Sequence, residues 1–382
     1  MRFEALLERQ EGGELSQGEA AELLGMSERT FRRWRDRLRE EGVEGLQDRR
    51  IGKPSSRRVP KEIVARVCRL FGDLYPDFTV KHFHEQLQKR HGYKLGYTVT
   101  KLVLQRAGLV RVAEGRSAHR KKRPRRPMVG MMLHQDASRF AWLPGDKRQY
   151  DLVETLDDAT SEIYSMFLVL EEGTASTFRA LAEVVAAKGL FCALYTDRGS
   201  HYFTTPKAGG RVSRTLLTQV GRALQQLGIE HIAAYSPEAR GRSERLFRTL
   251  QDRLPKEFRL AGIKTVSAAN RWLARHYIAE HNARFAVRAE QDGSAFVPDR
   301  RGAARDILCL QEERQVGNDN TVAWRTLRLQ IPPCLLRPHF ARARVRVHEY
   351  PDGRLAIFYG PHRLADYDAG GRLLADAHVR AA

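Results

Sequence analysis

Residues 129–285 alternate apolar stretches of strand length with longer amphipathic stretches, and their order limits the possible folds. Strands are predicted first, over 131–136, 150–156 and 163–170, with a turn at 157–158. Helix and strand periodicities then alternate over 174–187, 190–195, 216–227, 229–234, 243–254 and 266–282. This alternation predicts a mixed sheet with helices on its faces.

Three strands followed by helix, strand, helix, strand and helix is the element order of an RNase H-like sheet. A different α/β sheet of similar order also fits the pattern. The predicted fold class is a multidomain α/β chain, with an RNase H-like mixed α/β catalytic core at 129–285. All-α helix-turn-helix units precede this core, and a small β-domain follows it.

The segment 1–50 predicts a helix-turn-helix DNA-binding domain. Ser16 and Glu19 have the spacing of a capping box, and Ser27 can begin a second helix after the break at Gly25. The apolar face of that second helix consists of Phe31, Trp34 and Leu38. A short helix, a turn with glycine and a basic amphipathic helix are together typical of a DNA-reading unit.

Six arginines lie between positions 29 and 39, around the apolar face of this second helix. A helical hairpin whose arginines only face solvent would show the same pattern. We predict instead that the helix contacts DNA, because so dense a cationic surface matches phosphates and guanine edges. The predicted contacts are Arg29, Thr30, Arg32, Arg33 and Arg37.

Two further segments separate this domain from the core. Helical periodicity over 60–112 predicts either a second helix-turn-helix-like DNA-binding domain or a helical spacer, because its last helix carries only Lys101 and Arg106. The segment 113–128 is a basic linker whose prolines disfavour a packed helix. It suits an arm along phosphates or a solvated tether. The predicted DNA contacts in it are Arg120, Lys121, Lys122, Arg123, Arg125 and Arg126.

A small basic β-rich domain is predicted over 300–382. The turn 350–354 joins two strands, over 345–349 and 355–358, into a hairpin. A further strand is predicted over 326–331.

The charge balance indicates the class of partner. Lys and Arg total 66 against 46 Asp and Glu, which gives a net charge of +20 and predicts a nucleic-acid partner. The four cysteines lie far apart, as Cys68, Cys192, Cys309 and Cys334, which suits a reducing cytoplasm. No apolar run reaches the roughly 18–20 residues of a membrane span, so no membrane partner is expected.

Three acids stand where the predicted order would bring them together. Asp136 is expected to end the first strand, Asp197 follows the fourth, and Glu244 lies in the first turn of a helix. Three converging carboxylates form the oxygen-rich site that Mg²⁺ or Mn²⁺ prefers. Two such ions, about 3.5–4 Å apart, can support in-line attack on a phosphodiester.

Each acid has rivals or neighbours that the sequence leaves open. Asp157 or Asp158 could replace Asp136, although a tight turn favours a structural role for them. Glu238 and Glu257 compete with Glu244. His134 and His201 flank the acids and could contact phosphate, water or only neighbouring side chains. Around Glu244 we expect DNA-backbone contacts from Arg242, Arg245 and Arg248.

Two blocks of residues resemble a known family. They are Thr196-Asp-Arg-Gly-Ser200 and the run from Ser236-Pro237 through Gly241-Arg-Ser-Glu-Arg245 to Leu250. Both are similar to the integrase catalytic core of bacterial insertion-sequence transposases, a core shared with retroviral integrases. The resemblance covers about 130–285 and implies an Asp-Asp-Glu triad at Asp136, Asp197 and Glu244.

Two departures from the family accompany the resemblance. The 47 positions between Asp197 and Glu244 exceed the usual short spacing, and a predicted surface insertion at 204–214 absorbs the excess. Arg198 stands where the family often has Asn, which adds a positive charge and removes no ligand.

The resemblance and the residues together predict a DNA transposase. It would bind the ends of its insertion sequence, cleave them with two Mg²⁺ or Mn²⁺ ions, and join the 3′-hydroxyl ends to target DNA. The expected partners are double-stranded terminal-repeat and target DNA and further copies of the chain, in the bacterial cytoplasm at the nucleoid. The alternatives are an inactive transposase-derived DNA-binding regulator and an RNase H-like nuclease that does not join ends.

Overall fold

The computed structural model describes residues 2–48, 51–52, 58–112, 124–207, 210–235, 241–300 and 302–374. The chain divides into two compact units, and each is described by itself. The first comprises Met1–Pro76 and Thr98–Arg111, and the second comprises Asp77–Tyr97 and Val112–Ala382. This division assigns the middle of the segment 60–112 to the larger unit, which also contains the central sheet.

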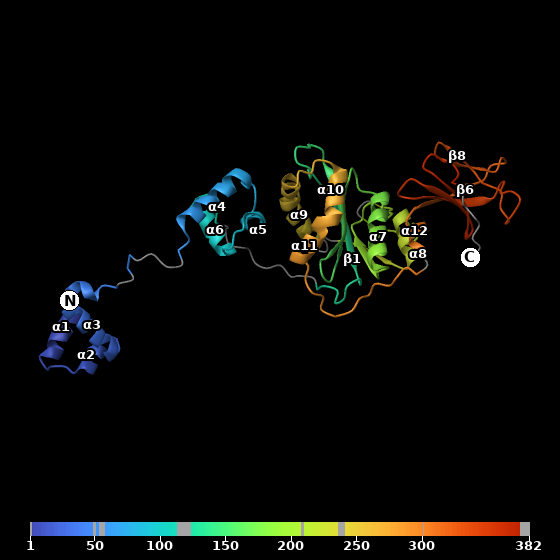
Figure 1. Cartoon of the computed structure of the whole chain (residues 1–382). Helices are drawn as coiled ribbons and strands as arrows, with labels where there is room; N and C mark the ends of the chain where they lie inside the picture. Colours follow the sequence, from blue (N-terminus) through green and yellow to red (C-terminus); the bar gives the residue numbers. More distant parts are fainter. Residues whose placement is uncertain are drawn as a thin grey trace. The chain divides into compact units, whose positions relative to one another are not determined.

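The first unit begins with the helix-turn-helix, drawn in dark blue in Figure 1. Its helices are α1 (Arg2–Glu11), α2 (Gln17–Leu23) and α3 (Glu28–Glu41), followed by the 3₁₀ turn η1 (Gly42–Leu46). Ser16 caps α2 in a capping box with Glu19, and Ser27 caps α3. The buried cluster beneath them contains Phe3, Leu7, Ala20, Ala21 and Phe31, with Trp34 and Leu38 packed against it.

Three helices follow in the chain. They are α4 (Lys61–Leu74), α5 (Val80–His91) and α6 (Tyr97–Arg106). Helix α5 begins at an N-cap, Thr79, and ends at Gly92, whose φ of 63° is the left-handed conformation that glycine adopts without strain. It belongs to the second unit, together with the core.

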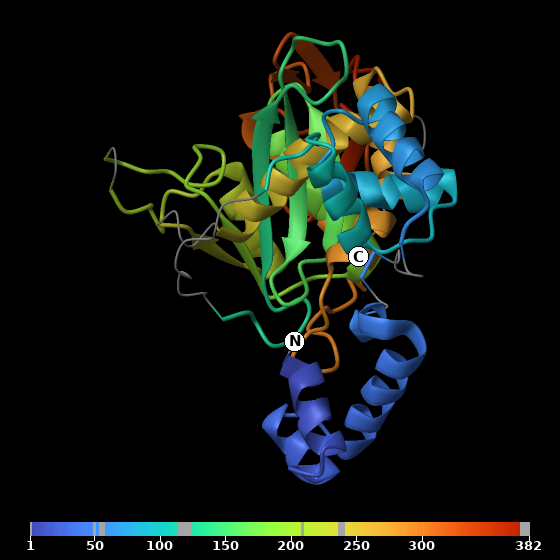
Figure 2. The same cartoon turned by 90° about the vertical axis from the view of Figure 1, so that its left-hand side faces the viewer.

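A five-stranded sheet forms the centre of the second unit. Its strands are β1 (Leu133–Phe140), β2 (Tyr150–Asp157), β3 (Ile163–Val169), β4 (Ala193–Thr196) and β5 (Glu230–Ala233). They lie in the order β3-β2-β1-β4-β5. Figure 2 shows strands of this sheet as green arrows in the middle of the view. The first three are antiparallel, whereas β4 is parallel to β1 and β5 to β4. This arrangement confirms the predicted RNase H-like mixed core.

Helices cover both faces of this sheet, as Figure 1 shows on either side of β1. One face carries α9 (Gly241–Leu260), α10 (Val266–Trp272), a π turn (Leu273–Tyr277) and α11 (Ile278–Phe285). The other carries α7 (Thr174–Lys188) and α8 (Gln219–Leu227). Leu152 and Leu250 are buried in the first layer, and Phe178 and Leu194 in the second.

Two asparagines cover the edge strand β3. The side chain of Asn270 accepts from Leu168 N (2.7 Å) and donates to Leu168 O (2.9 Å). Asn282 repeats this pair of bonds with Ile163, at 2.8 Å each. An edge strand otherwise presents unpaired backbone groups, so α10 and α11 complete the hydrogen bonding of the sheet here.

The C-terminal part begins with the short helix α12 (Ala304–Ile307) and is otherwise made of strands. One sheet has the order β11-β10-β9-β6, with β6 (Leu310–Gln315), β9 (Arg344–Glu349), β10 (Leu355–Tyr359) and β11 (His362–Tyr367). A second, two-stranded sheet pairs β7 (Thr321–Trp324) with β8 (Leu327–Gln330). Trp324, Val347 and Ile357 are buried between them.

Three predicted boundaries were wrong. Strand β1 continues beyond Asp136 to Phe140, because this stretch pairs with β2 in a hairpin that the apolar pattern does not reveal. Helix α9 continues through Pro255, because its apolar side runs on through Leu254 to Phe258, both fully buried. The single helix predicted over 266–282 is instead interrupted by the π turn Leu273–Tyr277.

The hydrogen bonds of Asn270 with β3 predict that their removal destabilises this strand. Asn270→Ala should lower the free energy of opening of β3 by about 1–3 kcal/mol, because Leu168 N–H and C=O both lose their partner away from water. Amide hydrogen exchange across β2 and β3 measures this quantity. Asn318→Ala, on the exposed surface of the C-terminal part, is the matched control and should change nothing there. An equal loss in the free energy of opening in both variants would contradict this role of Asn270.

Candidate active site

The parallel pairing of β1 with β4 runs towards two of the predicted acids. His134 lies beside Tyr195 in this ladder, and their rings are 5.1 Å apart on one face of the sheet. Two residues further along each strand stand Asp136 and Asp197. Asp197 itself follows the last residue of β4, Thr196, so the two acids stand at the same interval beyond this pair of neighbouring strand positions.

The surroundings of the two acids differ. Asp136 is buried, and its Oδ1 accepts from Ala137 N at 2.9 Å. Asp197 is half-buried, and its Oδ1 accepts from Gly199 N at 2.8 Å. Burial raises the pKa of Tyr202, and the negative charges of Glu172, Asp136 and Asp197 raise it further. Both acids therefore lie close enough to influence the same phenol.

A fourth carboxylate, Glu154, was not predicted from the sequence. It pairs with Asp136 across β1 and β2 and is completely buried. Burial raises the pKa of Glu154 well above its usual value, and the charge of Asp136 adds to this, while the nearby Ser243 hydroxyl opposes it. Strand β2 also carries Asp151 and Asp157 near its ends, and the signal that could have identified Glu154 is its place in the middle of the strand, between Val153 and Thr155.

Glu244 lies in the first turn of α9 and is exposed. Helix α9 crosses the face of the sheet that carries Asp136, since Gln251 Nε2 donates to Ser138 Oγ at 2.9 Å. Within the described ranges, however, no three acidic, histidine or cysteine side chains are close enough to hold a metal ion. Asp136 and Asp197 thus follow the paired residues His134 and Tyr195 at the same interval, and Glu244 lies on the helix that crosses this face.

The rival acids are occupied by structural contacts. Asp157 accepts from Gly130 N (2.8 Å) and Thr160 N (3.0 Å) at the turn after β2. Glu257 is buried and bonded to α5, while Glu238 lies outside the described residues. Asp157 and Glu257 therefore serve structural contacts.

Asp158 is the centre of a buried polar group beside the site. It accepts from His134 Nε2 at 2.7 Å and from Arg126 N at 2.6 Å, and Arg242 lies 3.1 Å away. Although burial acts in the opposite direction, the hydrogen bond from His134 and the nearby positive charges lower the pKa of Asp158 to about 2. Asp158 thereby joins the start of α9 to β1.

The arginines predicted to contact DNA near the site fall into two groups. Arg245 and Arg248 are exposed on α9. Arg242 is engaged with Asp158, and Arg125 donates to the carbonyl of Ala159 (3.0 Å) and to Ser161 Oγ (2.9 Å). The side chain of Arg126 is exposed. The predicted contacts Arg120, Lys121, Lys122 and Arg123 lie outside the described residues.

The helix-turn-helix presents its cations more openly. Arg29, Arg32 and Arg33 are exposed on α3, and no acidic residue of the described part of the chain pairs with them. Arg37 is half-buried. The Thr30 hydroxyl lies 2.9 Å from that of the N-cap Ser27, so it forms part of the cap.

Two further predicted features have structural partners. Arg198 donates to Gly210 O at 3.0 Å and lies over the ring of Tyr235, so it holds the inserted segment against β5. His201 packs on Tyr202 and lies 3.4 Å from Glu172.

Comparison with known proteins agrees with this architecture. Residues 2–65 match the winged helix-turn-helix family. A putative transposase, y4bF, from Sinorhizobium fredii is 30% identical over 359 residues, which cover 92% of this chain and 77% of the relative. The chain belongs to the insertion-sequence transposases. The transposase for insertion sequence IS1202 of Streptococcus pneumoniae is 25% identical over 69% of this chain and 63% of its own length.

Solved structures with low overall similarity were also found. The magnesium-bound catalytic core domain of HTLV-2 integrase covers 39% of the transposase and 88% of its own chain, with 14% identity and a TM-score of 0.30. A simian T-cell lymphotropic virus intasome covers 73% of this chain and 90% of its own, with 14% identity and a TM-score of 0.34. The fold assignment rests on the strand order. In the described ranges, no helix is long and apolar enough to cross a membrane.

The contacts of Asp158 predict a large effect on stability. Asp158→Asn should reduce the stability of the core by about 3–5 kcal/mol at pH 7, because a buried charged partner of His134 and Arg242 is lost. Since its pKa is lowered from 3.8 to about 2, this stabilisation is present above about pH 4 and is lost as the pH falls towards 2.

Urea unfolding at pH 7 and at pH 3 measures the effect of Asp158→Asn. The control is Asp292→Asn, whose side chain is 87% exposed and which should change stability by less than about 0.5 kcal/mol. A difference between wild type and Asp158→Asn that stays constant from pH 7 to pH 3 would contradict this role.

Proposed function

We propose that this transposase binds the ends of its insertion sequence, cleaves them and joins the 3′-hydroxyl ends to target DNA. The reaction would be a metal-dependent phosphodiester transfer at Asp136, Asp197 and Glu244. The observation that carries the proposal is the parallel register of β1 and β4, which pairs His134 with Tyr195 two residues before each of the two acids. Membership of the transposase family supports the same reaction.

The residues fit a divalent ion by their chemistry. Carboxylate oxygens are the donors that Mg²⁺ and Mn²⁺ prefer, and Asp136 and Asp197 supply them from adjacent strands. Glu244 stands on the helix that crosses the same face and would be the third donor. A pair of such ions would stabilise the charge that develops on the attacking and leaving oxygens.

The two chemical steps need no nucleophile from the protein. In the first, water attacks the phosphorus at the element end, the bond to the 3′ oxygen breaks, and that oxygen takes up a proton. In the second, the new 3′-hydroxyl attacks a phosphorus of target DNA and loses its proton, and the target's own 3′ oxygen leaves. The role of the carboxylates is to hold the ions and so fix the reacting oxygens.

The DNA-binding surfaces would hold the two substrates. We assign the terminal repeats to α3, with Arg29, Arg32 and Arg33 facing the groove. Arg245 and Arg248 would contact the DNA backbone near the site. Because an insertion sequence has two ends, at least two copies of the chain would act together on DNA.

The acids provide the direct test. Asp136→Asn, Asp197→Asn and Glu244→Gln should each lower end joining by at least about a hundredfold, because each removes a charge needed to hold the ions. Binding to the element end should persist. The measurement is joining of labelled end fragments with Mg²⁺, scored on a denaturing gel.

Asp146→Asn, in the turn between β1 and β2, is the matched control and should join like wild type, since Asp146 contacts only Arg148 and Tyr150 among the described residues. Joining at wild-type rate by any of the three acid variants would refute that residue's assignment. Cleavage without joined product in wild type would identify the chain as a nuclease.

The recognition helix provides a second test. Arg29→Ala or Arg33→Ala should weaken binding to the element end by about 1–3 kcal/mol more than binding to random duplex, because a bidentate contact with guanine distinguishes sequences. Competition binding at fixed salt measures the difference. Arg35→Ala is the control in the same helix, since Arg35 is already bonded to Asp36 at 2.9 Å. Equal losses on both DNAs would assign these arginines to phosphate, and the reading helix would then be sought in 97–108.

A further inference from the structure

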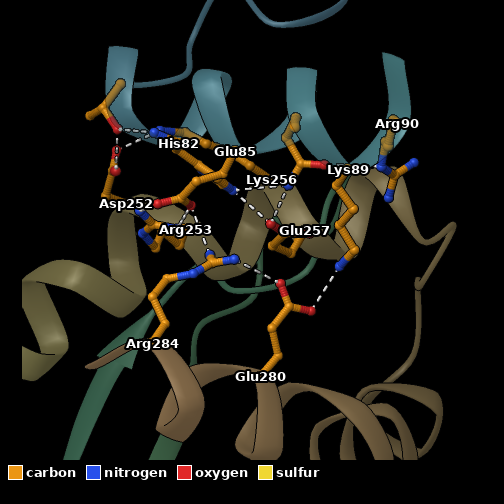
Figure 3. Close-up of polar contacts among 12 residues, drawn as sticks. His82, Glu85, Lys89, Arg90, Asp252, Arg253, Lys256, Glu257, Glu280 and Arg284 are labelled. Carbon is orange, nitrogen blue, oxygen red and sulfur yellow. Dashed lines mark hydrogen bonds and ion pairs between the residues drawn. The ribbon is translucent and has the colours of Figure 1, made fainter. Parts of the chain in front are cut away.

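Helix α5 is held to the catalytic core by a group of polar contacts that the proposed reaction does not use. We call this group the α5 clasp (Figure 3). It joins the α5 residues His82, Glu85, Gln86 and Lys89 to α9 and α11, through Arg253, Glu257, Glu280 and Arg284. All of these residues belong to the second compact unit.

The centre of the α5 clasp is Glu257. Its Oε1 lies 2.6 Å from His82 Nε2 and accepts from Gln86 Nε2 at 2.7 Å, and all three side chains are buried. Although burial acts in the opposite direction, the hydrogen bond and charge of His82 lower the pKa of Glu257. A buried acid with this many donors fixes one position of α5 along α9.

Glu85 makes the second buried contact. Arg253 reaches it through both terminal nitrogens, at 2.6 and 3.3 Å, and Arg284 approaches at 2.7 Å. The side chains of Glu85 and Arg253 are only 12% and 8% exposed. Removing the acid would leave two guanidinium groups facing each other, so this contact is specific to α5 in its present position.

More exposed pairs surround this centre. Lys89 bonds to Glu280 at 2.8 Å, and Arg259 forms a two-point contact with Asp77, at 2.7 and 3.0 Å. The clasp residues of α9 lie on both sides of Pro255, where the helix lacks one backbone hydrogen bond. The contacts with α5 therefore hold α9 on both sides of Pro255.

Helix α9 connects the α5 clasp with the candidate active site. Glu244 and Glu257 lie on the same helix, about 20 Å apart along its axis. Along the chain, residues 75–79 connect α4 to α5, and residues 92–96 connect α5 to α6. Each connection is five residues long. The basic linker that connects α6 to β1 covalently is much longer.

We propose that the α5 clasp, rather than the basic linker, is the attachment from which the helix-turn-helix reaches the element end, and that it thereby limits the distance between that end and the active site. It would thereby determine which phosphodiester is cut. This inference rests on the proposed function, because it needs an element end to be bound and cleaved. The residues of the α5 clasp are positioning residues, since none of them contacts the predicted metal-binding acids.

Mapping of the cleavage position tests the inference on the full chain. Wild type should cut a labelled element end at one phosphodiester. Glu85→Arg places a third positive charge between Arg253 and Arg284 and should spread the cuts over several neighbouring positions. Asp77→Arg should do so more weakly, and the double variant Asp77→Arg with Arg259→Asp should restore the single position by reversing the ion pair.

Two controls separate this role from a general loss of structure. Four residues inserted into the linker after Val112 should leave the cut position unchanged. Exchange of the exposed pair Arg288 and Asp292, whose side chains are 84% and 87% exposed, should also leave it unchanged. Asp77→Arg carries the test if Glu85→Arg does not fold.

A folded Asp77→Arg or Glu85→Arg that cuts only at the wild-type position would overturn the inference. A cut displaced by the linker insertion would overturn it as well, because the linker would then set the distance. Failure of wild type to cut at all would instead refute the proposed function, so the two failures are distinguishable.

Discussion

The parallel pairing of β1 with β4 is the constraint on which the rest of the molecule depends. It joins an antiparallel three-stranded meander to the later strands, and it pairs residues that lie two positions before Asp136 and Asp197, although 60 residues separate these acids in the chain. A slip of one residue would turn one of the carboxylates to the opposite face, so the proposed site depends on this register.

Helix α9 is the second element on which the account depends. Its first turn carries Glu244 and is tied through Arg242 to the buried Asp158. Its far half binds α5 through Glu257 and Arg253. One continuous helix thus links the candidate chemistry to α5, which precedes α9 by about 150 residues in the chain, even though Pro255 weakens α9 midway.

The sequence predicted the core well and its non-local contacts poorly. Asp136 and Asp197 could be proposed from the sequence because each lies in or just after an apolar strand, and Gly199, two positions after Asp197, supplies the backbone N–H that its carboxylate accepts from. The extension of β1 to Phe140 could not, because Ala137-Ser-Arg139 has little apolar character and forms a strand only through its partner β2. Similarly, nothing local indicates that Glu85 and Arg253 would meet, since an ion pair between distant helices has no periodicity. Glu154 was missed for the same reason, because its importance comes from standing opposite Asp136.

The stereochemistry of joining tests the central claim most directly. A target DNA that carries a phosphorothioate of known configuration at the joining position should give a joined product with inverted configuration. Inversion is expected because the 3′-hydroxyl would displace the target's 3′ oxygen in a single in-line step at the acidic site. Retention of configuration would reveal two successive displacements through a covalent protein intermediate and would contradict the account.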